Sequence, residues 1–551
     1  MALDHWHIPD TGLSQHFACD GNGDLVFRSG RGRDSRDITI RSIIDCVEPQ
    51  SRTPLILRFN DILYSSMTKI HDSFQLAMEE IEYPGGFRNM FQYLYPVKVC
   101  FENSVVDTVL QYGEQFGIGI ETGSSAEFAL AVHKVAERPG QTTVLFDGYK
   151  QRADLELAMN SEQVGCRPVI VIGDLDQLRL TIAFAKDSKW FPCIALRIRL
   201  QSSGAGRWAK SCGEHSKFGF SPEDLNEAQV FLERTSMLHT VVMIHFHPGS
   251  QVTRIAQIAM AVEQGVNTYI RLRSAGAKNL KSLDCGGGLV IEPQESDQAA
   301  DRTIDYDAQE YANSVVGTAL RCCSAAKIEP PKILIESGRA LVAQHAMLVV
   351  EVLNVRLGTE ITDRASGAAD VDLDRRRSQI LAPRSHDAAI CAFSIFRSLM
   401  DYFIEGRTFH FIPVQRLNEK PKHLVRIEDL SADSDGVIER FPNGRIGLPI
   451  HRQNEQHYHL AVPFVGAYQQ ALGCSHNMLG SVTQVAISSM SEPGAKACIT
   501  IMLGSTIEAE IAHHGHVLTE KTILQSYLKR STYPVKSTEC GSERHTRVHK
   551  L

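Results

Sequence analysis

The chain has 551 residues, of which 43% are hydrophobic and 22% charged, and its formal net charge is −7 at pH 7; this globular composition suits two or three domains and contains no basic run typical of nucleic-acid binding. No apolar stretch approaches the roughly 18–20 residues of a membrane span, and the N-terminal MALDHWHIPD lacks the basic and apolar regions of a secretory signal. We therefore expect a cytoplasmic protein without a membrane or nucleic-acid partner, whose 13 scattered cysteines are reduced thiols.

The first predicted region, residues 1–55, is polar and irregular, with short strand-like pieces such as Leu25–Phe27, and we expect it to join the C-terminal domain. Over residues 56–345, helix-length segments such as 126–137 and 305–326 alternate with short apolar runs, namely PLILRF, YLYPVKV, GIGIET, TTVLFDG, RPVIVIG, CIALRIRL, VVMIHFH, SLDCGGG and KILIES. About eight or nine strand–helix units at roughly 25–40 residue spacing predict a parallel (β/α)8 barrel, with a doubly wound open sheet as the alternative.

The pattern changes after residue 345. Runs such as VVEVLNVRL, HLVRIEDL, YHLAVPFVGAY, TQVAISSM and CITIML predict an antiparallel β-rich domain over residues 346–551. The polar residues 359–385 predict a loop or shortened insertion, and a final helix is expected at about 518–529. The fold class is therefore α/β plus β.

Barrel enzymes carry their chemistry at the C-terminal ends of the strands, and unusual residues of this sequence lie there. Lys98 ends the run YLYPVKV, where burial would lower its pKa; it is either a Schiff-base lysine or a lysine that reaches solvent from a strand edge. His245 and His247 of IHFHPGSQ suit a structural role or a metal-binding pair, although no third ligand has a convincing spacing.

Two later strand ends carry further candidates. The glycines of Asp284–Gly288 (DCGGG) would let backbone N–H groups approach a phosphate closely, although glycine runs also form plain turns. Glu336 and Arg339 of ESGR follow the last predicted barrel strand, and taken alone they could form a local ion pair. Together the strand ends offer a lysine, an imidazole, a phosphate cradle and a carboxylate.

In their order along the chain, these segments resemble the fold-type III pyridoxal-phosphate-dependent decarboxylases, and within that group the biosynthetic arginine decarboxylases. The resemblance spans residues 55–490 and is carried by YPVKV, GIETGSSAE, FDGYK, GEHSKFG, IHFHPGSQ, DCGGGL, ESGRAL, ADSDG and VGAYQ. It implies an alanine racemase-like (β/α)8 barrel with a β-rich domain and pyridoxal 5′-phosphate as the cofactor. The implied reaction is decarboxylation of a basic L-amino acid, arginine or a close analogue, to the amine (agmatine) and CO2.

The resemblance also implies a role for each matching position. Lys98 matches the lysine that forms the internal aldimine, His247 the histidine that stacks on the pyridine ring, and Glu336 the carboxylate that pairs with the ring nitrogen, which prepares the cofactor to accept electrons. Further cofactor-binding positions are Glu121, Arg197, Ser250, Gly286, Gly287, Gly288, Gly338, Arg339 and Tyr468, and Glu127 is another acid expected beside the cofactor. Asp433 matches an acid that holds the distal cation of the substrate, with Asp401 and Asp435 as assisting acids.

In this family the segment that matches ADSDG comes from the neighbouring subunit, so the resemblance implies a homodimer with shared active sites. The family pattern at 432–436 is C-D-S-D-G, and its cysteine helps to deliver a proton to the substrate carbon after CO2 has left. Ala432 stands in that place here and has no proton to donate. Cys100 and Cys391 are candidates to replace the thiol.

Three functional hypotheses therefore stay open at this stage. The chain is a plain decarboxylase in which another group replaces the thiol, or an enzyme that couples decarboxylation to oxidation or transamination because Ala432 leaves the intermediate unprotonated. The third hypothesis is a non-catalytic regulatory homologue, which the retained Lys98, His247, Glu336 and Arg339 argue against. Lysine, ornithine and modified arginines would satisfy the same acidic residues as arginine.

Overall fold

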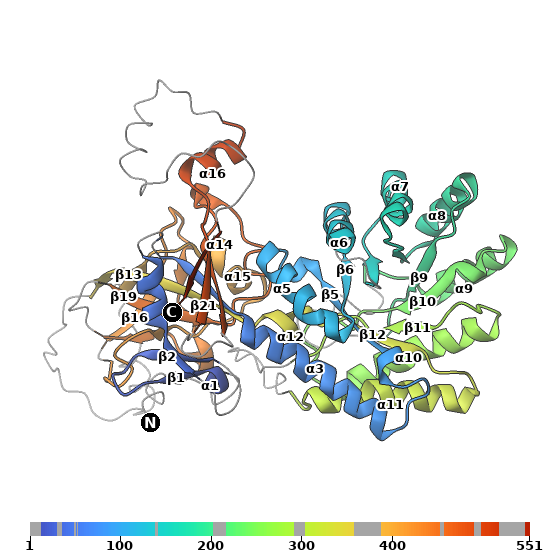
Figure 1. Cartoon of the computed structure of the whole chain (residues 1–551), viewed down its shortest axis with the longest axis horizontal. Helices are drawn as coiled ribbons and strands as arrows, with labels where there is room; N and C mark the ends of the chain where they lie inside the picture. Colours follow the sequence, from blue (N-terminus) through green and yellow to red (C-terminus); the bar gives the residue numbers. More distant parts are fainter. Residues whose placement is uncertain are drawn as a thin grey trace, which may run out of the picture. The chain divides into compact units, whose positions relative to one another are not determined.

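The computed structural model of the chain describes residues 13–29, 36–48, 51, 53–137, 142–201, 216–290, 304–357, 387–421, 423–451, 457–489, 497–516 and 546–550. These residues form two compact units: a barrel unit from Leu63 to Val342, and a β-rich unit of the residues up to Ile62 and from Ala343 onward (Figure 1). None of the described helices combines the length and the apolar character needed to span a bilayer.

Eight parallel strands close the barrel in the order β10-β11-β12-β5-β6-β7-β8-β9, which confirms the predicted barrel and excludes the open sheet. The strands are β5 (Phe91–Pro96), β6 (Gly119–Thr122), β7 (Val144–Phe146), β8 (Val169–Ile172), β9 (Cys193–Arg197), β10 (Val241–His245), β11 (Ser282–Asp284) and β12 (Lys332–Ile335). The helices of this unit are α3 (Asn60–Glu80), α4 (Phe87–Met90), α5 (Asn103–Gly113), α6 (Ser125–Glu137), α7 (Arg152–Ser161), α8 (Leu175–Ser188), α9 (Pro222–Arg234), α10 (Ile255–Ser274), α11 (Ala308–Ala326) and α12 (Gly338–Val342).

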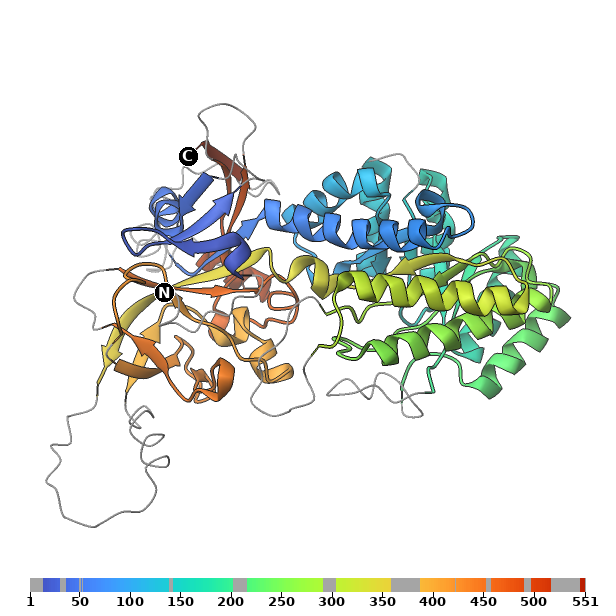
Figure 2. The same cartoon turned by 90° about the horizontal axis from the view of Figure 1, so that it is seen from below.

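Burial and capping explain why the sequence builds these elements. One apolar residue from each of six barrel strands contributes to a buried cluster. These residues are Leu94, Leu145, Val171, Ala195, Met243 and Leu334. The helix α11 begins at a capping box, in which Asp307 and Glu310 each accept a hydrogen bond from the other's backbone N–H. Its apolar face packs beside α10 on the outside of the barrel (Figure 2).

The β-rich unit contains a three-stranded sheet and an eleven-stranded sheet. The small sheet is β1 (Phe17–Cys19), β2 (Leu25–Ser29) and β3 (Arg36–Thr39), and the large one is β4 (Leu55–Phe59), β13 (Ala346–Arg356), β14 (Ala388–Cys391), β15 (Ile412–Pro413), β16 (His423–Glu428), β17 (Val437–Ile438), β18 (Leu448–Ile450), β19 (Tyr458–Pro463), β20 (Thr483–Ser489), β21 (Ala497–Met502) and β22 (Thr546–Lys550). Its helices are α1 (Leu13–His16), α2 (Ile40–Val47), α14 (Ile395–Ser398), α15 (Asp401–Ile404) and α16 (Ile507–His513). The predicted loop at 359–385 and the predicted helix at 518–529 lie outside the described residues.

The structure of the β-rich unit differs from the sequence prediction in two respects. The run PLILRF was expected among the barrel segments, but it forms β4, which pairs with β13 and β20 of the large sheet. That part of the prediction was wrong, because all five residues of β4 are buried and such a run suits either unit. The large sheet is also mixed rather than wholly antiparallel, since β14 pairs with β16 and β20 with β4 in parallel.

Candidate active site

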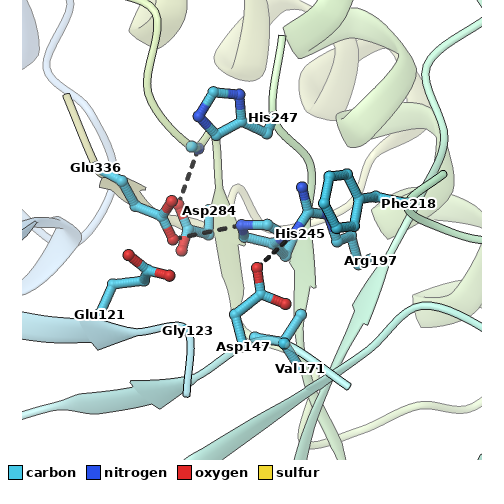
Figure 3. Close-up of polar contacts among 12 residues, drawn as sticks. Glu121, Gly123, Asp147, Val171, Arg197, Phe218, His245, His247, Asp284 and Glu336 are labelled. Atoms are coloured by element: carbon cyan, nitrogen blue, oxygen red, sulfur yellow. Dashed lines mark hydrogen bonds and ion pairs between the residues drawn. The ribbon is translucent and has the colours of Figure 1, made fainter. Parts of the chain in front are cut away.

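The C-terminal ends of the barrel strands gather most of the ionisable residues that the sequence pointed to. Strand register places them side by side: Pro96 of β5 pairs with Glu121 of β6, and His245 of β10 pairs with both Arg197 of β9 and Asp284 of β11. Lys98 follows β5 in a single 3-10 turn, Val97–Val99. Asp147 and Glu336 follow β7 and β12 directly, so the groups converge at one end of the barrel (Figure 3).

Lys98 and Glu121 form an ion pair at this end. Lys98 Nζ donates to Glu121 Oε2 at 2.6 Å, and the lysine side chain is 41% exposed whereas the glutamate is fully buried. Burial, with the nearby carboxylates of Glu336 and Asp147, raises the pKa of Glu121 to about 7, although the charge of Lys98 opposes this shift. The amine therefore reaches the barrel mouth while its partner stays inside the protein.

A second ion pair joins Arg197 to Asp147, across the intervening strand β8. The Arg197 guanidinium also lies over the ring of Phe218, 4.5 Å from its centroid (Figure 3). Burial alone would raise the pKa of Asp147, but the charges of Arg197 and His245 outweigh it and hold that pKa below its usual value. Sequence reasoning assigned no role to Asp147, although its place at the end of the predicted strand TTVLFDG was a signal.

His245, Asp284 and Glu336 form a third, buried group. His245 Nε2 lies 3.3 Å from Glu336 Oε1, and Asp284 Oδ1 accepts a hydrogen bond from Gly286 N at 2.9 Å. The sequence spacing had offered no third ligand for a metal beside the two histidines of IHFHPGSQ. The structure brings two carboxylates from other strand ends beside His245, and His247 is not part of this group.

His247 lies next to the glycine run. Its Nδ1 accepts a hydrogen bond from Gly249 N at 3.0 Å, and burial lowers the pKa of its imidazole to about 3, so the ring is neutral near pH 7. Gly286 has a φ of +63°, and a Cβ there would lie 2.5 Å from the Phe246 carbonyl oxygen. At Gly287 a Cβ would lie 3.1 Å from His247 Nε2. A residue with a side chain would therefore not fit at these positions, and the two glycines let the backbone pass close to the imidazole.

The sequence model of a family described as "Pyridoxal-dependent decarboxylase, pyridoxal binding domain" matches residues 68–343. A biosynthetic arginine decarboxylase of Bacteroides thetaiotaomicron is 30% identical over 98% of this chain and 96% of its own length. The chain belongs to the pyridoxal-dependent decarboxylase family. Pyridoxal 5′-phosphate is therefore its cofactor, as the sequence predicted.

Other relatives of this decarboxylase point the same way. The biosynthetic arginine decarboxylase of Deinococcus radiodurans is 30% identical over 84% of this chain and 80% of its own length. Among solved structures, a biosynthetic arginine decarboxylase from Campylobacter jejuni is 25% identical, with a TM-score of 0.76 over 94% of this chain and 92% of that chain. A diaminopimelate decarboxylase from m. jannaschi, 18% identical with a TM-score of 0.68, shares the fold.

The barrel end of the decarboxylase fits this cofactor. Lys98 supplies an amine for the aldehyde, and the glycine run offers backbone N–H groups without side chains to a phosphate. The buried Glu336 carboxylate, whose Oε1 lies 3.3 Å from His245 Nε2, is the acid that suits a ring N–H. Further predicted contacts lie at the same end, namely Ser250 in the loop after β10, and Gly338 and Arg339 in the first turn of α12. Glu127 instead accepts a hydrogen bond from Gly123 N at 2.7 Å and is half-buried.

The other predicted site residues of the decarboxylase belong to its β-rich unit. Asp433 and Asp435 lie in the exposed loop after β16, where Asp433 Oδ1 accepts a hydrogen bond from Asp435 N at 2.9 Å. His476 Nε2 lies 3.4 Å from Asp433 Oδ2, and the neighbouring Asn477 Oδ1 accepts a hydrogen bond from Ala432 N at 2.7 Å. The loop around Ala432 thus packs against an imidazole that sequence reasoning missed, because the two segments are far apart in the chain.

Tyr468 and Asp401 also lie in this unit. Tyr468 adopts a φ of +67°, a strained conformation for a tyrosine that persists only where neighbours hold it. The buried Arg58 of β4 donates to Gln470 beside it and so anchors this turn. Asp401 is fully buried, and Asp401 Oδ2 accepts a hydrogen bond from Gln469 Nε2 at 2.6 Å, which favours a structural role over substrate binding.

The narrow space above Gly287 gives a prediction for the decarboxylase. Gly287→Ala should weaken cofactor binding about tenfold, because the added Cβ would press on His247 Nε2. The matched control is Gly317→Ala in α11, where a Cβ would meet no atom within 4 Å, and we expect it to leave cofactor binding unchanged. Equilibrium dialysis of both variants tests this. Wild-type affinity in Gly287→Ala would show that the cofactor does not rest against this glycine.

Proposed function

We propose that this decarboxylase converts L-arginine to agmatine and CO2. The observation that carries the proposal is the single barrel end at which the Lys98 amine, the buried Glu336 carboxylate and the glycine cradle of 286–288 converge. The relatives described above, which cover nearly the whole chain, are named biosynthetic arginine decarboxylases. A cytoplasmic location is part of the proposal, supported by the free thiols of the described cysteines.

The cofactor, when bound, accepts the electron pair that stays on the substrate carbon as CO2 leaves. Lys98 would hold the cofactor covalently. Glu336 would keep a proton on the ring nitrogen, and the neutral His247 and Arg197 would contact the ring. Backbone N–H groups of the glycine run, with Ser250, Gly338, Arg339 and Tyr468, would hold the phosphate.

The substrate side is completed, in this proposal, by a second copy of the chain in a homodimer. The loop of residues 430–436 of that copy brings Asp433 and Asp435 to the distal end of the substrate. Two carboxylates suit a guanidinium, whose planar fork donates several hydrogen bonds to them. Both acids are exposed in the single chain, so they are available to a partner.

Substrate preference tests this assignment. The cofactor-loaded protein should release CO2 from L-arginine with a kcat/KM at least about 100-fold above that for L-ornithine or L-lysine, because a site built for a guanidinium leaves its acids unpaired with a smaller cation. Equal rates for the three amino acids would show that the acidic residues do not select for a guanidinium. No CO2 release from any of them would contradict the proposed function.

The missing thiol raises a second candidate function, decarboxylation followed by oxidation or transamination. Ala432 cannot protonate the substrate carbon, and Cys391 cannot replace the thiol because it is fully buried in the core of the β-rich unit. Burial also raises the pKa of Cys391 far above its usual value. We propose that His476, whose Nε2 lies 3.4 Å from Asp433 Oδ2, supplies the proton instead and keeps the amine as the product.

A double substitution tests this role. His476→Asn should lower the yield of agmatine by about tenfold, since a general acid typically contributes at least that much. Ala432→Cys in the same chain should restore the yield, whereas Ala432→Ser, which lacks an acidic thiol, should not. Product yields measured by mass spectrometry decide the matter. Unchanged agmatine in His476→Asn would remove His476 from the proton-transfer step.

A further inference from the structure

Three buried groups from three neighbouring strand ends meet beside the position of the cofactor ring. One possible ligand atom of each of His245, Asp284 and Glu336 lies within 4.8 Å of the other two, and their residues are 0%, 0% and 4% exposed (Figure 3). Only Glu336 has a role in the proposed function. The other two are buried polar residues whose presence that role does not explain, and burying such groups is unfavourable unless they are paired.

The hydrogen bonds of Asp284 leave one of its oxygens facing Glu336. Asp284 Oδ1 accepts from Gly286 N at 2.9 Å, while Asp284 Oδ2 has no other hydrogen-bond donor among the described residues and Glu336 Oε1 lies 3.3 Å from His245 Nε2. Two buried carboxylates this close cannot both be ionised beside a single imidazole, because the like charges repel each other in a medium of low dielectric constant. One of the two must carry a proton.

The surroundings decide which carboxylate is protonated. Burial and the charge of Glu336 raise the pKa of Asp284 well above its usual value, in spite of the hydrogen bond from Gly286. Burial opposes ionisation of Glu336 as well, but His245, 3.3 Å away, together with Lys98 outweighs it and holds the pKa of Glu336 below its usual range. The other titratable groups that face His245, Asp284 and Glu336 are Lys98, Glu121, Asp147, Arg197 and His247, of which His247 is neutral.

We infer that Asp284 is a neutral carboxylic acid in the folded protein, and that it and His245 act as positioning residues that hold Glu336 ionised and aimed at the cofactor ring. The Asp284 O–H donates a hydrogen bond to the Glu336 carboxylate, while the other Asp284 oxygen accepts one from Gly286 N. His245 Nε2 supports Glu336 Oε1 at 3.3 Å. The inference rests on the role of Glu336 in the proposed function, but it does not depend on which amino acid is the substrate.

Asp284→Asn is the sharpest test, because an asparagine amide places an N–H where the inferred O–H lies and keeps the oxygen that accepts from Gly286. We expect Asp284→Asn to bind pyridoxal 5′-phosphate within about threefold of wild type and to keep the pH dependence of the cofactor absorbance. Asp284→Ala should bind the cofactor about tenfold or more weakly, because Glu336 loses a donor. A merely structural aspartate would not give rescue by asparagine together with an unchanged absorbance titration.

A second measurement reads the protonation state directly. The infrared spectrum of the holoenzyme should contain the C=O band of a protonated carboxylic acid that disappears in Asp284→Asn. Absence of that band in wild type, or equal damage by asparagine and alanine, would overturn the inference. Stabilisation of the wild type by added zinc ions that is lost in Asp284→Asn would make the trio a metal site and would overturn it too. Arginine turnover enters none of these readouts, so failure of the inference is distinguishable from failure of the proposed function.

Discussion

Lys98→Ala should lower the rate of arginine decarboxylation by at least about 10³-fold, the largest effect that we expect from any single substitution in this chain. Lys98 is the amine at the end of β5 that reaches the barrel mouth, and Glu121 holds it there at 2.6 Å. Without it the cofactor would have no covalent anchor and the site would lose its amine. The measurement is kcat at saturating cofactor, together with the visible absorbance of the bound cofactor.

Lys150 provides the matched control for this prediction. It lies at the same end of the barrel but, unlike Lys98, it is buried, and burial lowers its pKa to about 8. Its Nζ donates to the carbonyl oxygens of Gly148 and Val171, both at 2.6 Å, so its amine already has two partners. Borohydride reduction of the holoenzyme followed by peptide mapping should therefore label Lys98 and not Lys150. A label on Lys150, or full activity in Lys98→Ala, would contradict the assignment.

Glu336→Gln is expected to have the second-largest effect, a loss of kcat on the order of 10²- to 10³-fold. An amide has nearly the shape of the carboxylate but no negative charge, so it cannot hold a proton on the ring nitrogen of the cofactor. Cofactor binding should weaken by about tenfold, as expected for Asp284→Ala, because the ring nitrogen loses its ionised partner, while Lys98 and the glycine run still hold the cofactor. The pair of measurements is kcat and the cofactor dissociation constant.

The control for this second prediction is Glu263→Gln on the outer face of α10. Glu263 is exposed and lies 3.8 Å from Arg321, a surface pair of the kind that contributes little. Its variant should keep the wild-type kcat. Glu336→Gln with the same unchanged kcat would mean that the charge of Glu336 does not assist the reaction.

The sequence predicted the barrel well, because the alternation of apolar runs with helix-length segments follows directly from its architecture. Eight of the predicted runs became β5 to β12, whereas PLILRF became β4 of the other unit. That error has a physical origin. Every residue of β4 is buried, and a fully buried run shows no alternation that would reveal which sheet it enters.

The candidate site was predictable in part. Lys98, His247 and Glu336 were found by their positions after apolar runs and by the resemblance that these segments carry. The supporting roles of Asp147, His245 and Asp284 were not found, because each depends on a neighbour supplied by another strand. The same holds for His476, whose proximity to Asp433 follows from the packing of the β-rich unit.

The most direct test of the central claim is an analysis of the products formed from L-arginine by the purified, cofactor-loaded protein, with and without oxygen. We predict agmatine and CO2 in equal amounts under both conditions, because proton delivery replaces the missing thiol and leaves no carbanion for oxygen to trap. A guanidino-aldehyde, oxygen consumption or conversion of the cofactor to its amine form would contradict this account and would make Ala432 the mark of a different reaction.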